Sequence, residues 1–116
     1  MAQPTPDGPA LVVNMFRMRP GIPPDRFAEF SATVDQPLCL AHSDIVTRFD
    51  AFRVAGPAGE AVGADIVEVM EVNDWNAWVR VRDHHPSLRP VMSGFDELVD
   101  PASVRSSFVV PILRGQ

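Results

Sequence analysis

One stretch in the middle of the chain, residues 63–72 (Gly-Ala-Asp-Ile-Val-Glu-Val-Met-Glu-Val), constrains the fold more than any other. It is short and rich in β-branched residues, and it is followed by Asn73-Asp74, a turn and helix-capping pair. These features predict a β-strand near the middle of a sheet. Because side chains of a strand alternate between faces, Ile66, Glu68 and Met70 share one face. An isolated buried charge is too costly to keep, so Glu68 must be paired or solvated in a cavity, and it is the first candidate for a pocket residue.

Composition limits the class of protein. With 116 residues, 46% of them hydrophobic, the chain has the size of one domain that can bury a core without disulfides. The formal net charge of −5 and the lack of a basic block argue against nucleic acid and anionic membranes as partners. Cys39 is the single cysteine, and without a CxxC motif or a Cys/His cluster we expect no metal site and no redox dithiol. No apolar run approaches the ~20 residues of a membrane span, and the first nine residues do not resemble a signal peptide, so we expect a cytoplasmic protein.

Three further strands are predicted from β-branched and aromatic content, at residues 10–18, 45–54 and 104–113. Asn14 falls on an apolar face of the first of these strands, which makes it a second candidate for a pocket wall. Residues 1–9 are rich in proline and poor in apolar side chains, and we expect a flexible tail there. The sequence Gly56-Pro57-Ala58-Gly59 predicts a turn or hairpin loop before the central strand.

Two helical regions are predicted from apolar residues at helical spacing. The first should begin at Pro23-Pro24 and end around Asp35, ahead of an apolar connector at residues 37–42. The second should be capped by Asn73 or Asp74 and break at residues 83–86. A segment capped by Ser87 should then run to about residue 99, weakened by Gly94.

The order strand, helix, strand, strand, helix, strand is that of the ferredoxin-like βαββαβ plan, an α+β fold with a four-stranded antiparallel sheet in the order 4-1-3-2. We expect one such domain over residues 10–114. Both helical regions would cover one face of the sheet, so the other apolar face needs a partner. A homodimer that closes two sheets into a dimeric α+β barrel meets this need. It would enclose a cavity for each protomer, and we expect Asn14 and Glu68 to face that cavity.

Several spaced segments resemble a known family: residues 13–21 (Val-Asn-Met-Phe-Arg-Met-Arg-Pro-Gly), 34–39, 52–54, 65–72, 95–100 and 110–112. Together they are similar to the RedY/HapK-like family of prodigiosin-type and bisindole pathways, small proteins of the dimeric α+β barrel superfamily. The likeness extends over about residues 10–113 as a spaced pattern, without a signature as specific as a metal motif. The resemblance implies action without a metal or organic cofactor on pyrrole or indole intermediates, where the protein shapes how two heteroaromatic units are joined or rearranged.

The candidate acids and bases are three histidines and one glutamate. His84 and His85 follow Asp83, which could orient one of them as a general acid or base, although both could instead cap or solvate the helix break. His42 is the third histidine, and as a loop residue it is more simply explained by a hydrogen bond to the backbone. Glu68 would become a proton shuttle if a dry pocket raised its pKa. The structural alternative is a buried salt bridge with Arg48 or Arg17.

The predicted substrate contacts are polar residues and an apolar lining. Asn14 and Arg48 are the polar candidates, and the apolar ones are Phe16, Met18, Met70 and Phe108, against which an aromatic ligand could lie. Trp75 and Trp78 are expected to pack a helix on the sheet. Cys39 is expected to be a small buried hydrophobe rather than a nucleophile.

These observations favour a cofactor-free biosynthetic enzyme that acts on an indole or pyrrole intermediate by positioning and proton transfer. Two alternatives stay open. One is a cofactor-independent monooxygenase on the same barrel fold. The other is a non-catalytic protein that binds a hydrophobic metabolite. The expected partners are therefore a second copy of the chain and a small aromatic metabolite.

Overall fold

The computed structural model of the chain describes residues 6–56 and 62–115. Four strands form one antiparallel sheet in the order β2-β3-β1-β4. The strands are β1 (Ala10–Phe16), β2 (Val46–Arg53), β3 (Ile66–Val72) and β4 (Arg105–Val109). The predicted order is confirmed, with β1 and β3 in the centre. Most of the expected turn at residues 56–59 and of the expected tail at residues 1–9 lies outside the described residues.

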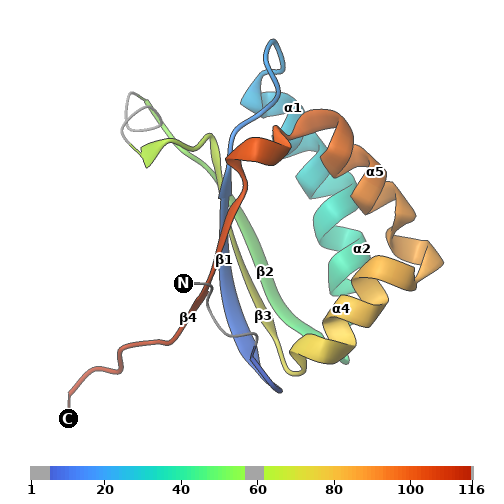
Figure 1. The fold of residues 1–116 in the computed structure, drawn as a ribbon, viewed down its shortest axis with the longest axis vertical. Coiled ribbons are helices and arrows are strands. Elements are labelled where there is room, and N and C mark those ends of the chain that lie inside the picture. Colours follow the sequence, from blue (N-terminus) through green and yellow to red (C-terminus); the bar gives the residue numbers. More distant parts are fainter. Residues whose placement is uncertain (1–5, 57–61, 116) are drawn as a thin grey trace.

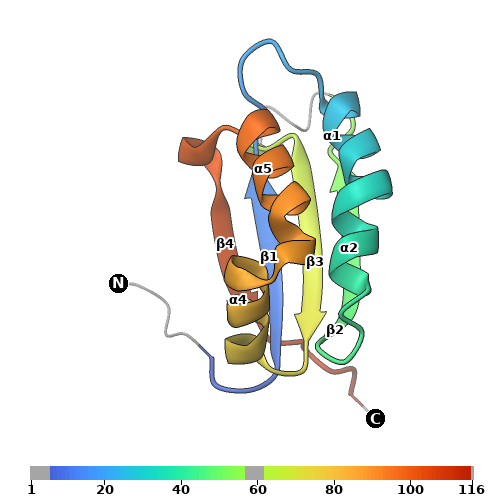
Figure 2. The same cartoon turned by 90° about the vertical axis from the view of Figure 1, so that its right-hand side faces the viewer.

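The helices lie on one face of the sheet. Figure 1 shows the sheet edge-on with all helices on one side, and Figure 2 shows them side by side in front of the strands. Near β2 and β3 lie α1 (Pro24–Phe30) and α2 (Gln36–Leu40), and near β1 and β4 lie α4 (Trp75–His84) and α5 (Arg89–Leu98). This arrangement is the ferredoxin-like α+β fold. Among the described residues, no helix is both long and apolar enough to cross a membrane.

The first helical region is longer than the sequence suggested. We expected it to end around Asp35, but a π-helical turn, Ser31–Asp35, joins α1 directly to α2, so the predicted connector is mostly helix. The N–H of Gln36 bonds the carbonyl of Ser31, five residues earlier. Pro37 then stands in the first turn of α2, where a missing N–H costs least. The wide turn allows the helix to continue past a proline that normally ends one.

The last strand is shorter than predicted. We expected it to reach residue 113, but β4 ends at Val109, which pairs with Leu11, the second residue of β1. The chain then leaves the sheet and extends away from the body (Figure 1). Its apolar side chains are almost fully exposed: Val110 at 86%, Ile112 at 99% and Leu113 at 84%. A segment this apolar is expected to bind another surface.

The core consists of two apolar clusters between sheet and helices. One contains Phe16, Phe27, Ile66 and Leu98, and the other contains Val12, Phe49, Met70, Trp78 and Leu88. On β3, Ile66 belongs to the first cluster and Met70 to the second, so Glu68 stands between them on the same face. The polar position therefore separates two apolar cores.

Candidate functional site

A row of polar side chains crosses the sheet between the two apolar clusters. The register pairs Ser106 of β4 with Asn14 of β1, and Asn14 with Glu68 of β3. Ser106 Oγ donates a hydrogen bond of 2.7 Å to Asn14 Oδ1, and Asn14 Nδ2 donates a longer one of 3.5 Å to Glu68 Oε1. The sheet thus presents one carboxyl group, held through an amide and a hydroxyl, to the space beneath the helices.

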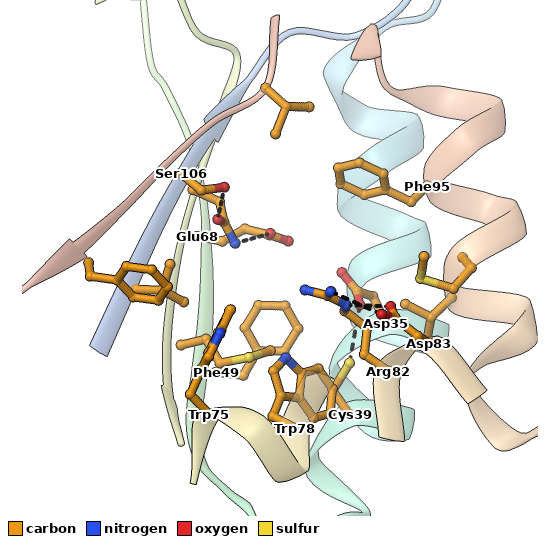
Figure 3. A pocket seen from close by; sticks show the side chains of 17 residues that line it. Asp35, Cys39, Phe49, Glu68, Trp75, Trp78, Arg82, Asp83, Phe95 and Ser106 are labelled. Carbon is orange, nitrogen blue, oxygen red and sulfur yellow. Dashed lines mark hydrogen bonds and ion pairs between the residues drawn. The ribbon is translucent and has the colours of Figure 1, made fainter. Parts of the chain in front are cut away.

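That space is a cavity of about 400 Å³ between the sheet and the helices (Figure 3). Its polar lining residues are Asn14, Asp35, Glu68, Arg82, Asp83 and Ser106. We expected Asn14 and Glu68 to face a cavity enclosed between two protomers, but they face one inside a single protomer. The cause is strand alternation, since Glu68 shares its face with the core residues Ile66 and Met70.

Asp35 lies in the helical wall opposite Glu68, and Figure 3 shows both carboxyl groups directed into the same region. Each residue is 4% exposed. Asp35 Oδ1 accepts a hydrogen bond of 3.5 Å from Cys39 Sγ, one helical turn later. Glu68 Oε2 has no hydrogen-bond partner among the described residues. One oxygen of this buried carboxyl group is therefore available for a hydrogen bond with a ligand.

Burial changes the acidity of this pair. It raises the pKa of Asp35 to about 6, against the opposing effect of the Cys39 hydrogen bond. Burial also raises the pKa of Glu68 well above its usual value, and the negative charge of Asp35 and the hydrogen bond between the two carboxyl groups raise it further. An ionised Asp35 therefore favours the protonated form of Glu68. Burial likewise raises the pKa of the Cys39 thiol, so this cysteine is not a ready nucleophile.

Five aromatic residues line the rest of the cavity: Phe49, Trp75, Trp78, Phe95 and Phe108. The rings of Trp75 and Phe108 meet edge to face, with centroids 4.9 Å apart. The guanidinium carbon of Arg82 lies 6.0 Å from the centroid of the Trp75 ring. Trp75 and Trp78, which we expected only to pack a helix on the sheet, also form a wall of the site. Such a surface suits a flat aromatic ligand.

The three histidines lie elsewhere. His42 Nε2 lies 2.9 Å from Ser87 Oγ, and the rings of His42 and His85 meet edge to face at 4.8 Å. His84 and His85 line a separate surface hollow beside α4 and α5. Asp83, the expected orienting group, is instead bonded to the guanidinium of Arg82 at 2.9 Å. The structure therefore brings His42 and His85 together, but not into the cavity.

Some of the predicted substrate contacts line the cavity and others do not. Asn14, Met70 and Phe108 line the cavity. Phe16 and Met18 are buried in the neighbouring apolar cluster, and Arg48 is exposed on the other face of the sheet, where it pairs with Asp50 at 2.6 Å. The two arginines proposed as salt-bridge partners of Glu68 are thus paired elsewhere, because Arg17 binds Asp65.

Sequence reasoning missed the second carboxyl group of the site. Asp35 was taken as the end of a helix, yet it follows Phe27 and Ser31 at intervals of four residues, and all three are buried. An acid on the apolar side of a helix was the signal that could have identified it. Among the described residues, no group of three or more His, Cys, Asp or Glu side chains is placed to hold a metal ion.

Several solved structures share this fold. HapK from Hahella chejuensis is 16% identical, with a TM-score of 0.64, over 91% of this chain and 97% of that one. SnoaB, a cofactor-independent oxygenase from Streptomyces nogalater, is 15% identical, with a TM-score of 0.66, over 92% and 96%. A dimeric ferredoxin-like protein of unknown function from Thermobifida fusca is 17% identical, with a TM-score of 0.68, over 90% and 92%. At these identities the similarity concerns the fold.

The comparison of the sequence with known protein families gives a more specific result. No curated protein matches the chain. The family described as REDY-like protein HapK, however, matches it over residues 10–110, which include every strand and helix of the fold. The chain therefore belongs to the REDY-like HapK family.

Proposed function

We propose that this protein is a small biosynthetic enzyme that acts, without a cofactor, on an indole or pyrrole intermediate of a bisindole or prodigiosin-type pathway. In this proposal it directs coupling or rearrangement by positioning and proton transfer. The observation that carries the proposal is the buried pair Glu68 and Asp35 facing a cavity walled by aromatic rings. Membership of the REDY-like HapK family supports the choice of substrate.

The cavity has the right size and surface for a small heteroaromatic molecule. Its volume of about 400 Å³ falls in the range usual for small-molecule sites, which is roughly 300–1,000 Å³. Aromatic walls hold a flat ring by area and by edge-to-face contacts. The polar groups of the sheet, Asn14, Glu68 and Ser106, form one wall, and Asp35 faces them from the helical wall. A bound ring would then present its polar atoms to Glu68 and its flat faces to the tryptophans.

In this proposal Glu68 is the proton donor and acceptor. Its raised pKa favours the protonated form, and its Oε2, which has no hydrogen-bond partner among the described residues, can donate that proton into the cavity. Asp35 acts as a positioning residue, because its charge sets the acidity of Glu68. A general acid of this kind typically contributes about 10²–10⁴ in rate.

The alternative candidates for the acid or base of proton transfer are the three histidines. His42, His84 and His85 could act if the substrate extends beyond the cavity toward the α4–α5 side of the molecule. Each single His→Ala variant should be assayed for initial rate on a substrate that the wild type converts. A loss of about 100-fold or more in one variant favours this assignment, and rates within a few-fold of wild type leave proton transfer to Glu68.

A second candidate function is a cofactor-independent monooxygenase. The similarity of fold to SnoaB favours it as the alternative, because that protein is a cofactor-independent oxygenase. An electron-rich indole or pyrrole is also a chemically suitable substrate for oxygen. Oxygen uptake during turnover separates this function from redox-neutral coupling.

The proposal is tested by incubating the purified protein with reactive bisindole and bipyrrole precursors. The ratio of coupled products should differ from that of the protein-free reaction and should be reached with many turnovers per protein molecule. An unchanged ratio would contradict the proposal. A change that needs one protein molecule per product molecule would indicate a binding protein instead.

We further propose that the protein works as a homodimer formed through the uncovered face of the sheet. Apolar residues on that face include Val13, Val67 and Val69, and Phe52 beside them is 52% exposed. The exposed apolar segment after Val109 leaves the same sheet. The structure from Thermobifida fusca with the same fold is dimeric, which supports a second copy of the chain as the partner.

A further inference from the structure

The charge of the cavity, and not only its shape, restricts what it can bind. We propose that the ligand of this cavity is a flat, delocalised cation, such as a protonated or N-alkylated heteroaromatic ring. The inference rests on the proposed function, because it names the substrate class of the same cavity. It concerns binding alone and assigns no bond-forming step.

The first support is an imbalance of charged groups. The charged residues that line the cavity are Asp35, Glu68, Asp83 and Arg82, three acids and one base. Arg82 already binds Asp83 with both a bond of 2.9 Å from Nε and a longer one of 3.4 Å from Nη2. The positive charge of Arg82 is therefore largely neutralised by Asp83. The two buried carboxyl groups, Asp35 and Glu68, have no basic partner in the cavity lining.

The second support is that no cation of the described protein pairs with either buried acid. The ion pairs among the described residues join Arg17 with Asp65, Arg48 with Asp50, Arg53 with Asp25 and Arg82 with Asp83. A charge that is removed from water and left unpaired destabilises the folded protein. A buried acid without a basic partner in a cavity is a candidate for pairing with a ligand.

The third support is the unfilled position on Glu68. Glu68 is 4% exposed, and its Oε2 has no hydrogen-bond partner among the described residues. Its other oxygen receives only a long bond of 3.5 Å from Asn14. A cationic ring would place its charge close to Asp35, and the protonated Glu68 would donate from Oε2 to an acceptor atom on the same ligand. One ligand would then satisfy both the missing bond and the missing charge.

The fourth support is the nature of the walls. The faces of aromatic rings attract cations, and the attraction is stronger where water is excluded. Trp75 already makes such a contact with the guanidinium of Arg82, whose carbon lies 6.0 Å from the ring centroid. Trp78, Phe49 and Phe95 offer further rings around the same space. A cage of aromatic rings closed by carboxyl groups is a typical receptor for delocalised cations.

Titration of the pair gives the inference a pH dependence. Near pH 8 Asp35 is ionised, and the groups that face it are Glu68 from β3 and Cys39 from α2, with Arg82 and Asp83 of α4 farther along the wall. Protonation of Asp35 around pH 6 removes the charge that a cation would pair with. The affinity for a cation should fall as the pH is lowered, whereas that for an uncharged ring should not.

The test compares two probes of nearly equal shape, 1-methylquinolinium and the uncharged 1-methylquinolin-2-one. Binding is followed by calorimetry and by the fluorescence of Trp75 and Trp78, the two tryptophans of the chain, which both line the cavity. We expect the cation to bind at least tenfold tighter at pH 8, with most of the preference lost at pH 5. Asp35→Asn should lose the preference at pH 8. The exposed control Asp44→Asn should keep the preference.

Equal binding of the two probes by the wild type at pH 8 overturns the inference, and so does a preference that persists in Asp35→Asn. If that variant does not fold, the pH dependence of the wild type decides alone, because the preference must disappear with the charge. The outcome is separate from that of the proposed function. A protein that prefers the cation but leaves product ratios unchanged supports the ligand class and contradicts the enzyme.

Discussion

At the scale of single residues, the central feature is a pair of carboxyl groups buried where the core is otherwise apolar. Glu68 could be predicted as a pocket residue from the sequence, because an acid that shares a strand face with Ile66 and Met70 must be paired or solvated in a cavity. Asp35 could not be predicted as its partner, because the two residues belong to elements whose relative position only the fold determines. Their meeting depends on how the first helical region packs on the sheet.

Burial of Asp35 should make stability depend on pH. A raised folded-state pKa means that the folded protein holds this proton more tightly than the unfolded chain. The stability that the folded protein gains by binding this proton on Asp35 is therefore complete below pH 3.8, the ordinary pKa of the group. It is lost as the pH rises through about 6. Between pH 5 and pH 8 the free energy of unfolding of the wild type should fall by about 1 kcal/mol more than that of Asp35→Asn. Urea unfolding at fixed protein concentration measures the difference, and parallel pH profiles would refute it.

At the scale of elements, the strands were easier to predict than the helix ends. The sheet order follows from the order of elements along the chain, and the central strands from their β-branched content. The continuation of the first helical region past Pro37 could not be read from the sequence, because proline is a normal stop signal. The π-helical turn at Ser31–Asp35 removes that conflict and also carries the buried acid. π-Helical turns are frequent at functional sites.

Gly94 illustrates how packing overrides helix propensity. From the sequence it only weakens a helix, but a Cβ at this position would collide with the ring of Phe30. We expect Gly94→Ala to lower the free energy of unfolding by about 1–3 kcal/mol, although alanine favours the isolated helix by ~1 kcal/mol. Gly115→Ala, where a Cβ meets nothing, is the matched control and should be neutral. Urea denaturation compares the two, and a more stable Gly94→Ala variant would contradict the close packing of α5 on α1.

At the scale of the whole molecule, the fold was predictable but the location of the site was not. The sequence indicates that one face of the sheet lacks a cover, and it also indicates polar residues that need a cavity. Combining these two indications predicted a cavity on the uncovered face of the sheet, enclosed by the dimer. The alternation along β1 and β3 instead directs Asn14 and Glu68 toward the helices. The uncovered face is then left for association alone.

The dimer is tested by sedimentation equilibrium at micromolar concentration. We expect twice the chain mass of 12.7 kDa, because the uncovered sheet face and the apolar segment after Val109 have no cover within one protomer. Val69→Arg, in the middle of that face, should shift the protein toward monomer. Asn76→Arg, on the exposed side of α4, should not. A wild-type protein that sediments as a 12.7 kDa monomer would contradict the proposed association.

The central claim, that the protein acts in the cavity between sheet and helices, is tested most directly by two substitutions on one strand. Glu68 and Glu71 lie on opposite faces of β3, one buried at the cavity and the other exposed. Glu68→Gln and Glu71→Gln therefore make the same chemical change on either side of the sheet. The measurement is the rate and product ratio with reactive bisindole precursors. The account predicts a loss of about 100-fold or more for Glu68→Gln and near wild-type behaviour for Glu71→Gln, whereas equal effects, or a larger one at Glu71, would contradict it.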